Sequence, residues 1–201
     1  MPRIGRRGSR AAFEFELRAS VRGLWADEYT AAEFQSNMLL VLDVGYRGAW
    51  MSGAADYGIT SESELTDAEL NALNNLIFEA YGHVAGLAAF VQEHSRANGG
   101  RLGDCLARLP LWYQRYDQAM NQGRVMAGRD QKQIWTLGVA EHCDSCLKLA
   151  GQVRRGSFWL SHGVLPQVPG CNYLLCKGWR CACQLLPTDL PMSRGRLPSL
   201  P

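Results

Sequence analysis

The chain has 201 residues, of which 47% are hydrophobic and 20% charged, and its formal net charge is +2 at pH 7. This composition is typical of a globular protein and excludes a disordered chain, because it supplies enough apolar side chains to form a core. No window of about eighteen residues is uninterruptedly apolar, which excludes a transmembrane helix and argues against a membrane partner.

The first ten residues are predicted to form a basic arm, because four of them are arginine. The segment that follows contains Glu14, Glu16 and Arg18, so the start lacks the apolar region of a secretory signal peptide. We therefore expect the protein to be made in a cytosol, where cysteines stay reduced.

The charge is distributed unevenly along the chain. Residues 1–25 carry six basic and two acidic side chains, residues 26–100 carry two and eleven, and residues 101–201 carry thirteen and six. The two basic ends could therefore approach DNA or another acidic partner, whereas the middle could not. The same uneven charge distribution would arise if these charged side chains only formed the water-exposed faces of helices and bound no acidic partner.

Residues 11–133 are predicted to be a helical domain. Between about residues 29 and 56, apolar side chains recur three or four positions apart, which is typical of an amphipathic helix. Thr66 and Glu69 fit a capping box, in which each side chain accepts a hydrogen bond from the other residue's amide. They are predicted to begin one helix with a single apolar stripe that runs to about His94.

A further helix is predicted over residues 102–133. Pro110 is expected to bend it, because the proline ring removes an amide donor and crowds the preceding turn. Cys105 stands alone in this helix and is expected to be a small buried hydrophobic residue.

After Arg129 the helical periodicity disappears. The pieces QIWTLGVA, GQVRRGSFWL and CQLLPT are short, β-prone and separated by Gly and Pro. The predicted fold class is therefore α+β: a mostly helical N-terminal region followed by a small cysteine-rich module of zinc-ribbon or treble-clef type at residues 134–187. The proline-rich tail, residues 188–201, should be an extended strap or disordered.

Six of the seven cysteines lie in this last part of the chain, spaced Cys-x2-Cys, then twenty-four residues, then Cys-x4-Cys-x4-Cys-x-Cys. In a protein without a secretory signal, this spacing indicates a structural zinc site in which two groups of thiolates complete a tetrahedron. Short strands and loops bury too little apolar surface to fold alone, whereas zinc binding contributes about 10 kcal/mol or more. Disulfide bonds and reduced cysteines that merely pack remain the alternatives.

The predicted metal ligands come from five cysteines, of which the first two form one pair and two or more of the last three form the second group. These are Cys143, Cys146, Cys176, Cys181 and Cys183. Cys171 is expected to be the spare thiol. His142 is adjacent to Cys143 and would not easily reach the same ion, so we expect it to lie outside the ligand shell or at the surface.

No catalytic motif accompanies the cysteines. Nothing near any cysteine in the sequence supports its activation as a nucleophile, and the residue order of zinc deaminases is absent. A ββα zinc nuclease would need more histidines than the single His162 after the first pair. No glycine-rich phosphate loop occurs either. We therefore predict that the protein is not an enzyme and has no small-molecule substrate.

The segments IWTLGVAEHCDSCLKLAGQV, GVLPQVP and CKGWRCACQLLPT together resemble the C-terminal signature of the Mu F-like phage head morphogenesis family, also called minor capsid proteins. Members of that family typically have a Cys-x2-Cys pair followed by L.G.V, a proline-containing loop, and a closing block similar to His-Pro-x-Cys-Arg-Cys. The matching residues here are Cys143, Cys146, Leu149, Gly151, Val153, Cys181 and Cys183.

The resemblance covers about residues 134–188, and this chain departs from the family pattern at one position. The family's histidine falls on Gly178, which cannot bind a metal. Cys176 stands two residues earlier and is the expected substitute. The upstream helices are similar to the family's only in general character.

The resemblance implies a structural protein of a phage virion. It would be made in the host cytoplasm, be present in few copies inside the head or at the portal vertex, and act in head assembly or in genome packaging and delivery. Its partners would be portal or capsid proteins, with packaged DNA near the basic ends. The alternative is a zinc-ribbon protein whose main task is to bind nucleic acid.

Overall fold

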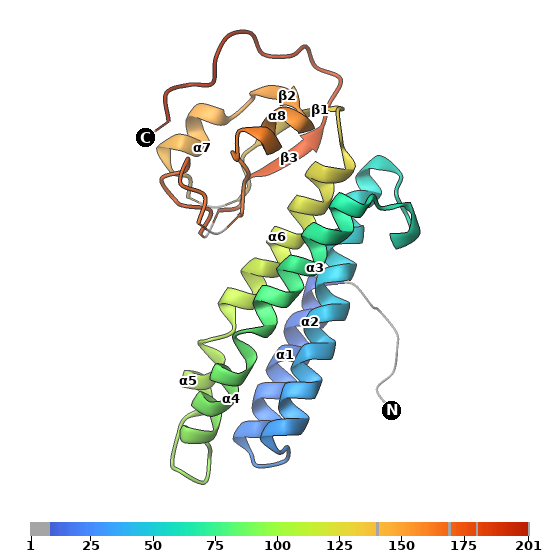
Figure 1. Cartoon of the computed structure of the whole chain (residues 1–201). Coiled ribbons are helices and arrows are strands. Elements are labelled where there is room, and N and C mark those ends of the chain that lie inside the picture. Colours follow the sequence, from blue (N-terminus) through green and yellow to red (C-terminus); the bar gives the residue numbers. More distant parts are fainter. Residues whose placement is uncertain (1–8, 140, 169, 180, 201) are drawn as a thin grey trace. The chain divides into compact units, whose positions relative to one another are not determined.

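The computed structural model describes residues 9–139, 141–168, 170–179 and 181–200 (Figure 1). Most of the predicted basic arm lies outside these residues. The described helices are α1 (Arg10–Trp25), α2 (Ala31–Ala54), η1 (Ala55–Tyr57), η2 (Glu62–Glu64), α3 (Asp67–Tyr81), α4 (Val84–Glu93), α5 (Leu102–Leu106), α6 (Pro110–Ala127), α7 (Asp144–Leu149) and α8 (Gly156–Ser161). The strands are β1 (Lys132–Thr136), β2 (Val153–Arg155) and β3 (Gln184–Pro187).

The predicted fold class is confirmed. A mostly helical N-terminal region, with α2, α3 and α6 as long helices, precedes a small antiparallel sheet and clustered cysteines. None of the described helices combines the length and apolar character that crossing a membrane requires.

By its internal contacts the chain divides into two compact units. Unit 1 comprises residues 1–49 and 71–116, and unit 2 comprises residues 50–70 and 117–201. The cysteine-rich module predicted for residues 134–187 therefore lies within unit 2.

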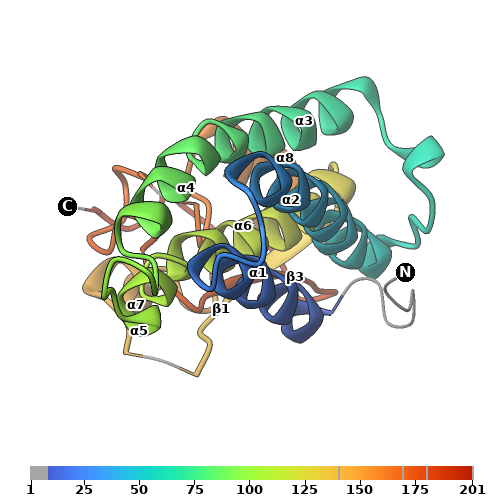
Figure 2. The ribbon, with the colours of Figure 1, turned by 90° about the horizontal axis from the view of Figure 1, so that it is seen from below.

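Unit 1 is built from helices that pack through their apolar faces. α1 packs against α4 and α5, and Figure 2 shows α1 and α5 side by side. The ring of Phe13 on α1 lies 5.5 Å from that of Tyr46 and 5.1 Å from that of Tyr116. Cys105 on α5 is fully buried, as predicted.

The capping box at the start of α3 is confirmed. The amide of Thr66 donates to Glu69 Oε2 at 2.7 Å, and the amide of Glu69 donates to Thr66 Oγ1 at 3.3 Å. These two bonds satisfy amide groups that have no partner within the helix.

The prediction of one continuous helix to about His94 is wrong. α3 ends at Tyr81 and α4 begins at Val84. Between them, the amide of His83 bonds to the carbonyl three residues earlier, at 3.2 Å, so the chain makes a turn. Gly82 favours this interruption because glycine has a low helix propensity.

The predicted helix over residues 102–133 is also wrong in two places. Pro110 begins α6 instead of bending a longer helix, because the first helical position needs no amide donor. α6 then ends at Ala127. Gly128 lies where a Cβ atom would come within 2.2 Å of Gln133 Nε2, and Arg129 has a φ of 44°, so the chain leaves the helix and enters β1.

Unit 2 contains a three-stranded antiparallel sheet in the order β2-β1-β3. Ile134 on the central strand lies opposite Val153 of β2 and Leu186 of β3. The β-prone pieces are thus strands in part. GSFWL, which we predicted as extended, instead forms the short helix α8.

The core of unit 2 gathers side chains from most of its segments. Its buried members are Val125, Trp135, Cys146, Leu149, Trp159, Val164, Cys171, Leu174, Cys183 and Leu185.

The proline-rich tail contains no helix or strand in residues 188–200. It runs along unit 2 as the extended strap that was one of the two predicted forms. Ser193 bonds to both backbone groups of Val153 at 3.0 Å, and Lys148 Nζ donates to the carbonyl of Ser199 at 3.0 Å.

Candidate metal centre

The first two cysteines of the cluster are placed by the short helix α7. Cys143 is its N-cap residue and Cys146 lies in its first turn. Their sulfur atoms are 3.5 Å apart. Because the backbone between them turns back on itself, the pair presents two thiols to the same point in space.

Ser145, between these cysteines, connects them to the second cysteine segment. Its side chain is fully buried, and its Oγ accepts a hydrogen bond from the amide of Leu175 at 3.1 Å. This bond holds the neighbouring Cys176 against the first pair. Ser145 was not among the predicted site residues, since nothing in the local sequence shows that its partner lies thirty residues away.

Cys176 begins a tight turn. The amide of Trp179 bonds to the Cys176 carbonyl at 2.8 Å, and the two residues between them, Lys177 and Gly178, have φ values of 49° and 74°. The Gly178 amide also donates to the Cys176 thiol. Gly178 therefore has left-handed backbone, a conformation that favours glycine.

Cys181 and Cys183 lie just before β3. Cys183 is fully buried, and the amide of Gly138 donates to its sulfur. A Cβ atom on Gly138 would come within 2.1 Å of the Ala182 carbonyl oxygen, so only glycine allows the two backbones to approach this closely.

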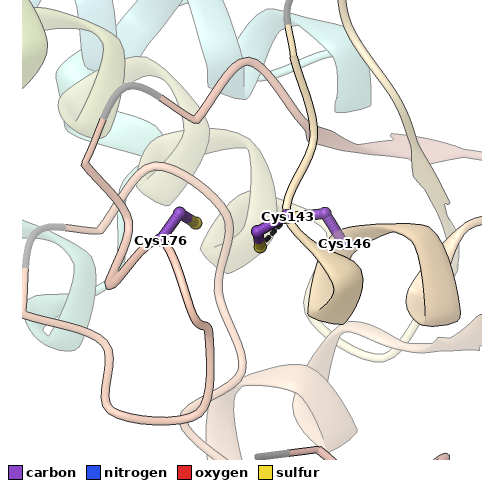
Figure 3. Close-up of side chains that lie close together, drawn as sticks. All are labelled: Cys143, Cys146 and Cys176. Atoms are coloured by element: carbon purple, nitrogen blue, oxygen red, sulfur yellow. Dashed lines mark hydrogen bonds between the residues drawn. The ribbon is translucent and has the colours of Figure 1, made fainter.

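The five predicted cysteines meet in two groups that share Cys146. One group is Cys143, Cys146 and Cys176, the other is Cys146, Cys181 and Cys183, and within each group the sulfur atoms lie within 4.8 Å of one another. Figure 3 shows the first group, with Cys176 approaching Cys143 from a separate segment.

The spacing of the sulfur atoms suits a tetrahedral metal ion. Four sulfurs at about 2.3 Å from zinc are about 3.8 Å from one another. The Cys143 and Cys146 sulfurs are separated by 3.5 Å, and the Cys146 and Cys181 sulfurs by 3.8 Å. Neither pair is a disulfide, and all seven cysteines are free.

The environment of the thiols favours ionisation at some positions and opposes it at others. Hydrogen bonds from the thiols of Cys146 and Cys181 lower the pKa of Cys183 to about 3. Burial by itself would raise the pKa of Cys143, but hydrogen bonds from the amides of Cys146 and Cys176 outweigh it and lower that pKa.

The other three thiols have raised pKa values. The pKa of Cys146 rises because its thiol donates to Cys181 and Cys183, and burial raises the pKa of Cys176 to about 12. The pKa of Cys181 is raised as well, because its thiol donates to Cys183 and is partly buried, although a hydrogen bond with Cys146 acts in the opposite direction. The cluster thus holds few negative charges without a cation, and a divalent ion would allow more of the thiols to ionise.

The remaining predicted residues lie around the cluster or outside it. Cys171, the expected spare, belongs to neither group, and its thiol donates to the Gly163 carbonyl at 3.3 Å. His142 is half-buried, and its Nδ1 is 3.7 Å from Cys183 Sγ.

Comparisons with known proteins give no relative of this chain. No family model matches it, and neither a curated protein nor a solved structure matches it. The described arrangement can bind a thiophilic metal ion through cysteines that come from three segments of unit 2.

Proposed function

We propose that this chain is a structural protein of bacteriophage head assembly, similar in role to the Mu F-like proteins that its C-terminal motifs resemble, and that zinc stabilises its unit 2. One observation carries this proposal. Cys143 and Cys146 of the first motif block come together with Cys181 and Cys183 of the closing block, with Cys146 common to both groups. The cysteines of the resemblance thus lie together in the cluster that could hold a metal ion.

Zinc is the ion that best suits this donor set. Thiolates bind zinc strongly, whereas calcium and magnesium require oxygen ligands. The thiols also have the surroundings that stabilise bound thiolates, because backbone amides donate to the sulfurs of Cys143, Cys176 and Cys183. A structural role agrees with the burial of Cys146 and Cys183 in the core of unit 2.

In the proposed role, the metal makes unit 2 a rigid surface for other proteins. Its partners would be portal or capsid proteins, and its place would be inside the head or at the portal vertex of the virion. The basic ends of the chain would lie near packaged DNA, whose phosphates attract Arg and Lys side chains. The proposal assigns the protein no catalysis.

The zinc site is tested by measuring metal and thiols in the same sample. The full chain is purified without added zinc, its metal content is measured by mass spectrometry, and its free thiols are counted before and after removal of metal by a chelator. We expect stoichiometric zinc and additional reactive thiols after chelation. A protein that holds no stoichiometric zinc and gains no reactive thiols after chelation would overturn the zinc site.

The role in head assembly is tested on particles. Virus particles produced by the strain that encodes this chain are purified, and their proteins are identified by mass spectrometry. We expect this chain in the particles in few copies, together with the portal. Its absence from the particles would overturn the proposal, and tight DNA binding by the free chain with a steep salt dependence would support a nucleic-acid-binding protein instead.

A further inference from the structure

His142 lies beside the cysteine cluster, and its hydrogen bonds determine which nitrogen faces that cluster. Its Nε2 is 2.9 Å from the carbonyl oxygen of Gly138. Since a carbonyl oxygen only accepts, Nε2 carries the hydrogen, and Nδ1 of the neutral ring keeps its lone pair. This Nδ1 is 3.7 Å from Cys183 Sγ. The ring therefore presents its lone pair to the cluster.

The same arrangement holds histidine ligands in metal sites. A histidine that binds a metal almost always donates its other N–H group to a carbonyl, a carboxylate or water, which fixes the ring and its tautomer. In a tetrahedral zinc site, with Zn–N about 2.0 Å and Zn–S about 2.3 Å, the nitrogen and sulfur atoms are about 3.5 Å apart. The distance between Nδ1 and Cys183 Sγ is close to this value.

We propose that His142 is the fourth ligand of an ion held by Cys146, Cys181 and Cys183. The inference rests on the proposed zinc site and specifies its ligands. In the structure His142 Nδ1 lies beside Cys183 but not within 4.8 Å of all three sulfur atoms, so ion binding requires Cys146, Cys181 and the imidazole to come closer together. Cys143 and Cys176 then flank the site.

Burial favours this group of cysteines over the other one. Cys146 and Cys183 are buried and Cys181 is half-buried, whereas Cys143 and Cys176 are both half-buried. In a closed structural site the ion is bound only by protein atoms, and water is kept away from it. The Cys146–Cys181–Cys183 group therefore suits a permanent ion better.

A reactive Cys–His pair does not explain the contact between His142 and Cys183. The histidine of such a pair activates the thiol, but the thiol must then reach a substrate. Cys183 is 0% exposed, so no substrate can reach it. Metal binding needs no such access once the protein has folded.

Gly138 fixes both members of this contact. Its carbonyl accepts from His142, its amide donates to the Cys183 sulfur, and its missing side chain allows the approach of Ala182. Both donor atoms are therefore positioned by one residue of the loop that follows β1.

X-ray absorption at the zinc edge tests the proposal directly. The spectrum is recorded on the full chain, on His142→Ala and on the control His162→Ala, which alters an exposed histidine of unit 2 outside the cluster. We expect three sulfur ligands and one nitrogen ligand in the wild type and in the control. In His142→Ala the nitrogen ligand should be lost, and zinc affinity should fall by more than the roughly 10- to 100-fold that removal of an outer-shell partner costs.

The outcomes separate this inference from the proposed zinc site. Four sulfur ligands in the wild type, with unchanged zinc affinity in His142→Ala, would overturn the role of His142 and leave the zinc site intact. If the wild type binds no stoichiometric zinc, both proposals fail. The wild-type spectrum decides the ligand set even if His142→Ala does not fold.

Discussion

Unit 1 and unit 2 are stabilised in different ways. In unit 1, the helices bury apolar side chains that recur at helical spacing, such as Phe34, Met38 and Leu42 on α2. In unit 2, the sheet has strands of three to five residues, and its core includes three cysteines. Long helices thus present continuous apolar faces to one another, whereas the short elements of unit 2 are joined by contacts between distant parts of the chain.

The largest effect is expected from Cys146→Ser, because Cys146 belongs to both groups of sulfur atoms. Loss of the proposed zinc ion would remove about 10 kcal/mol, which is comparable to the whole stability of a domain. We expect the described parts of unit 2 to lose ordered structure while the helices of unit 1 persist. Hydrogen exchange measured by mass spectrometry reports each segment separately.

Cys105→Ala is the matched control for this variant, since Cys105 is a buried cysteine of unit 1 outside the cluster. It should keep zinc and leave exchange in unit 2 unchanged. Equal protection of unit 2 in Cys146→Ser and in the wild type would contradict a metal-dependent unit.

Leu42→Ala should produce the opposite pattern. Leu42 is fully buried on α2, and removing its side chain should cost about 2–5 kcal/mol of unfolding free energy in unit 1. Zinc content should not change. Leu40, on the same helix, is 63% exposed, so Leu40→Ala should change stability by less than about 0.5 kcal/mol. Urea unfolding compares the two, and equal losses would argue against a core at Leu42.

Gly138→Ala should weaken the metal site without removing a ligand. The new Cβ atom would collide with the Ala182 carbonyl and displace the donors to Cys183. Zinc affinity should fall by about 10- to 100-fold, as expected when outer-shell contacts are lost. Competition with a chelating dye measures this change. Gly86→Ala, where a Cβ atom meets nothing within 4 Å, should leave zinc affinity unchanged.

The smallest effect is expected from Thr66→Ala. This change removes the side chain that accepts from the Glu69 amide and should cost about 1 kcal/mol. Ser61→Ala is a useful comparison, because the Ser61 capping box begins a 3₁₀ helix of only three residues. Thermal unfolding should show a larger decrease in midpoint for Thr66→Ala, and the reverse order would contradict the importance of the α3 cap.

The sequence by itself determined the features that depend on neighbouring residues. Helical periodicity over residues 29–56 predicted α2, and Thr66 with Glu69 predicted the start of α3, because periodicity and capping operate within a few positions. The sequence also indicated a cysteine cluster, and the five cysteines expected there lie in two groups, with Cys171, the expected spare, outside both.

Only the tertiary structure decided how the gathered residues meet. The bond from Leu175 to Ser145, the close approach of Gly138 to Ala182, and the contact of His142 with Cys183 all join residues that are distant in the sequence. The end of α6 depended on such a contact too, since a Cβ atom on Gly128 would come within 2.7 Å of the Tyr57 side chain. Such contacts arise from packing in three dimensions, and local sequence patterns carry no record of them.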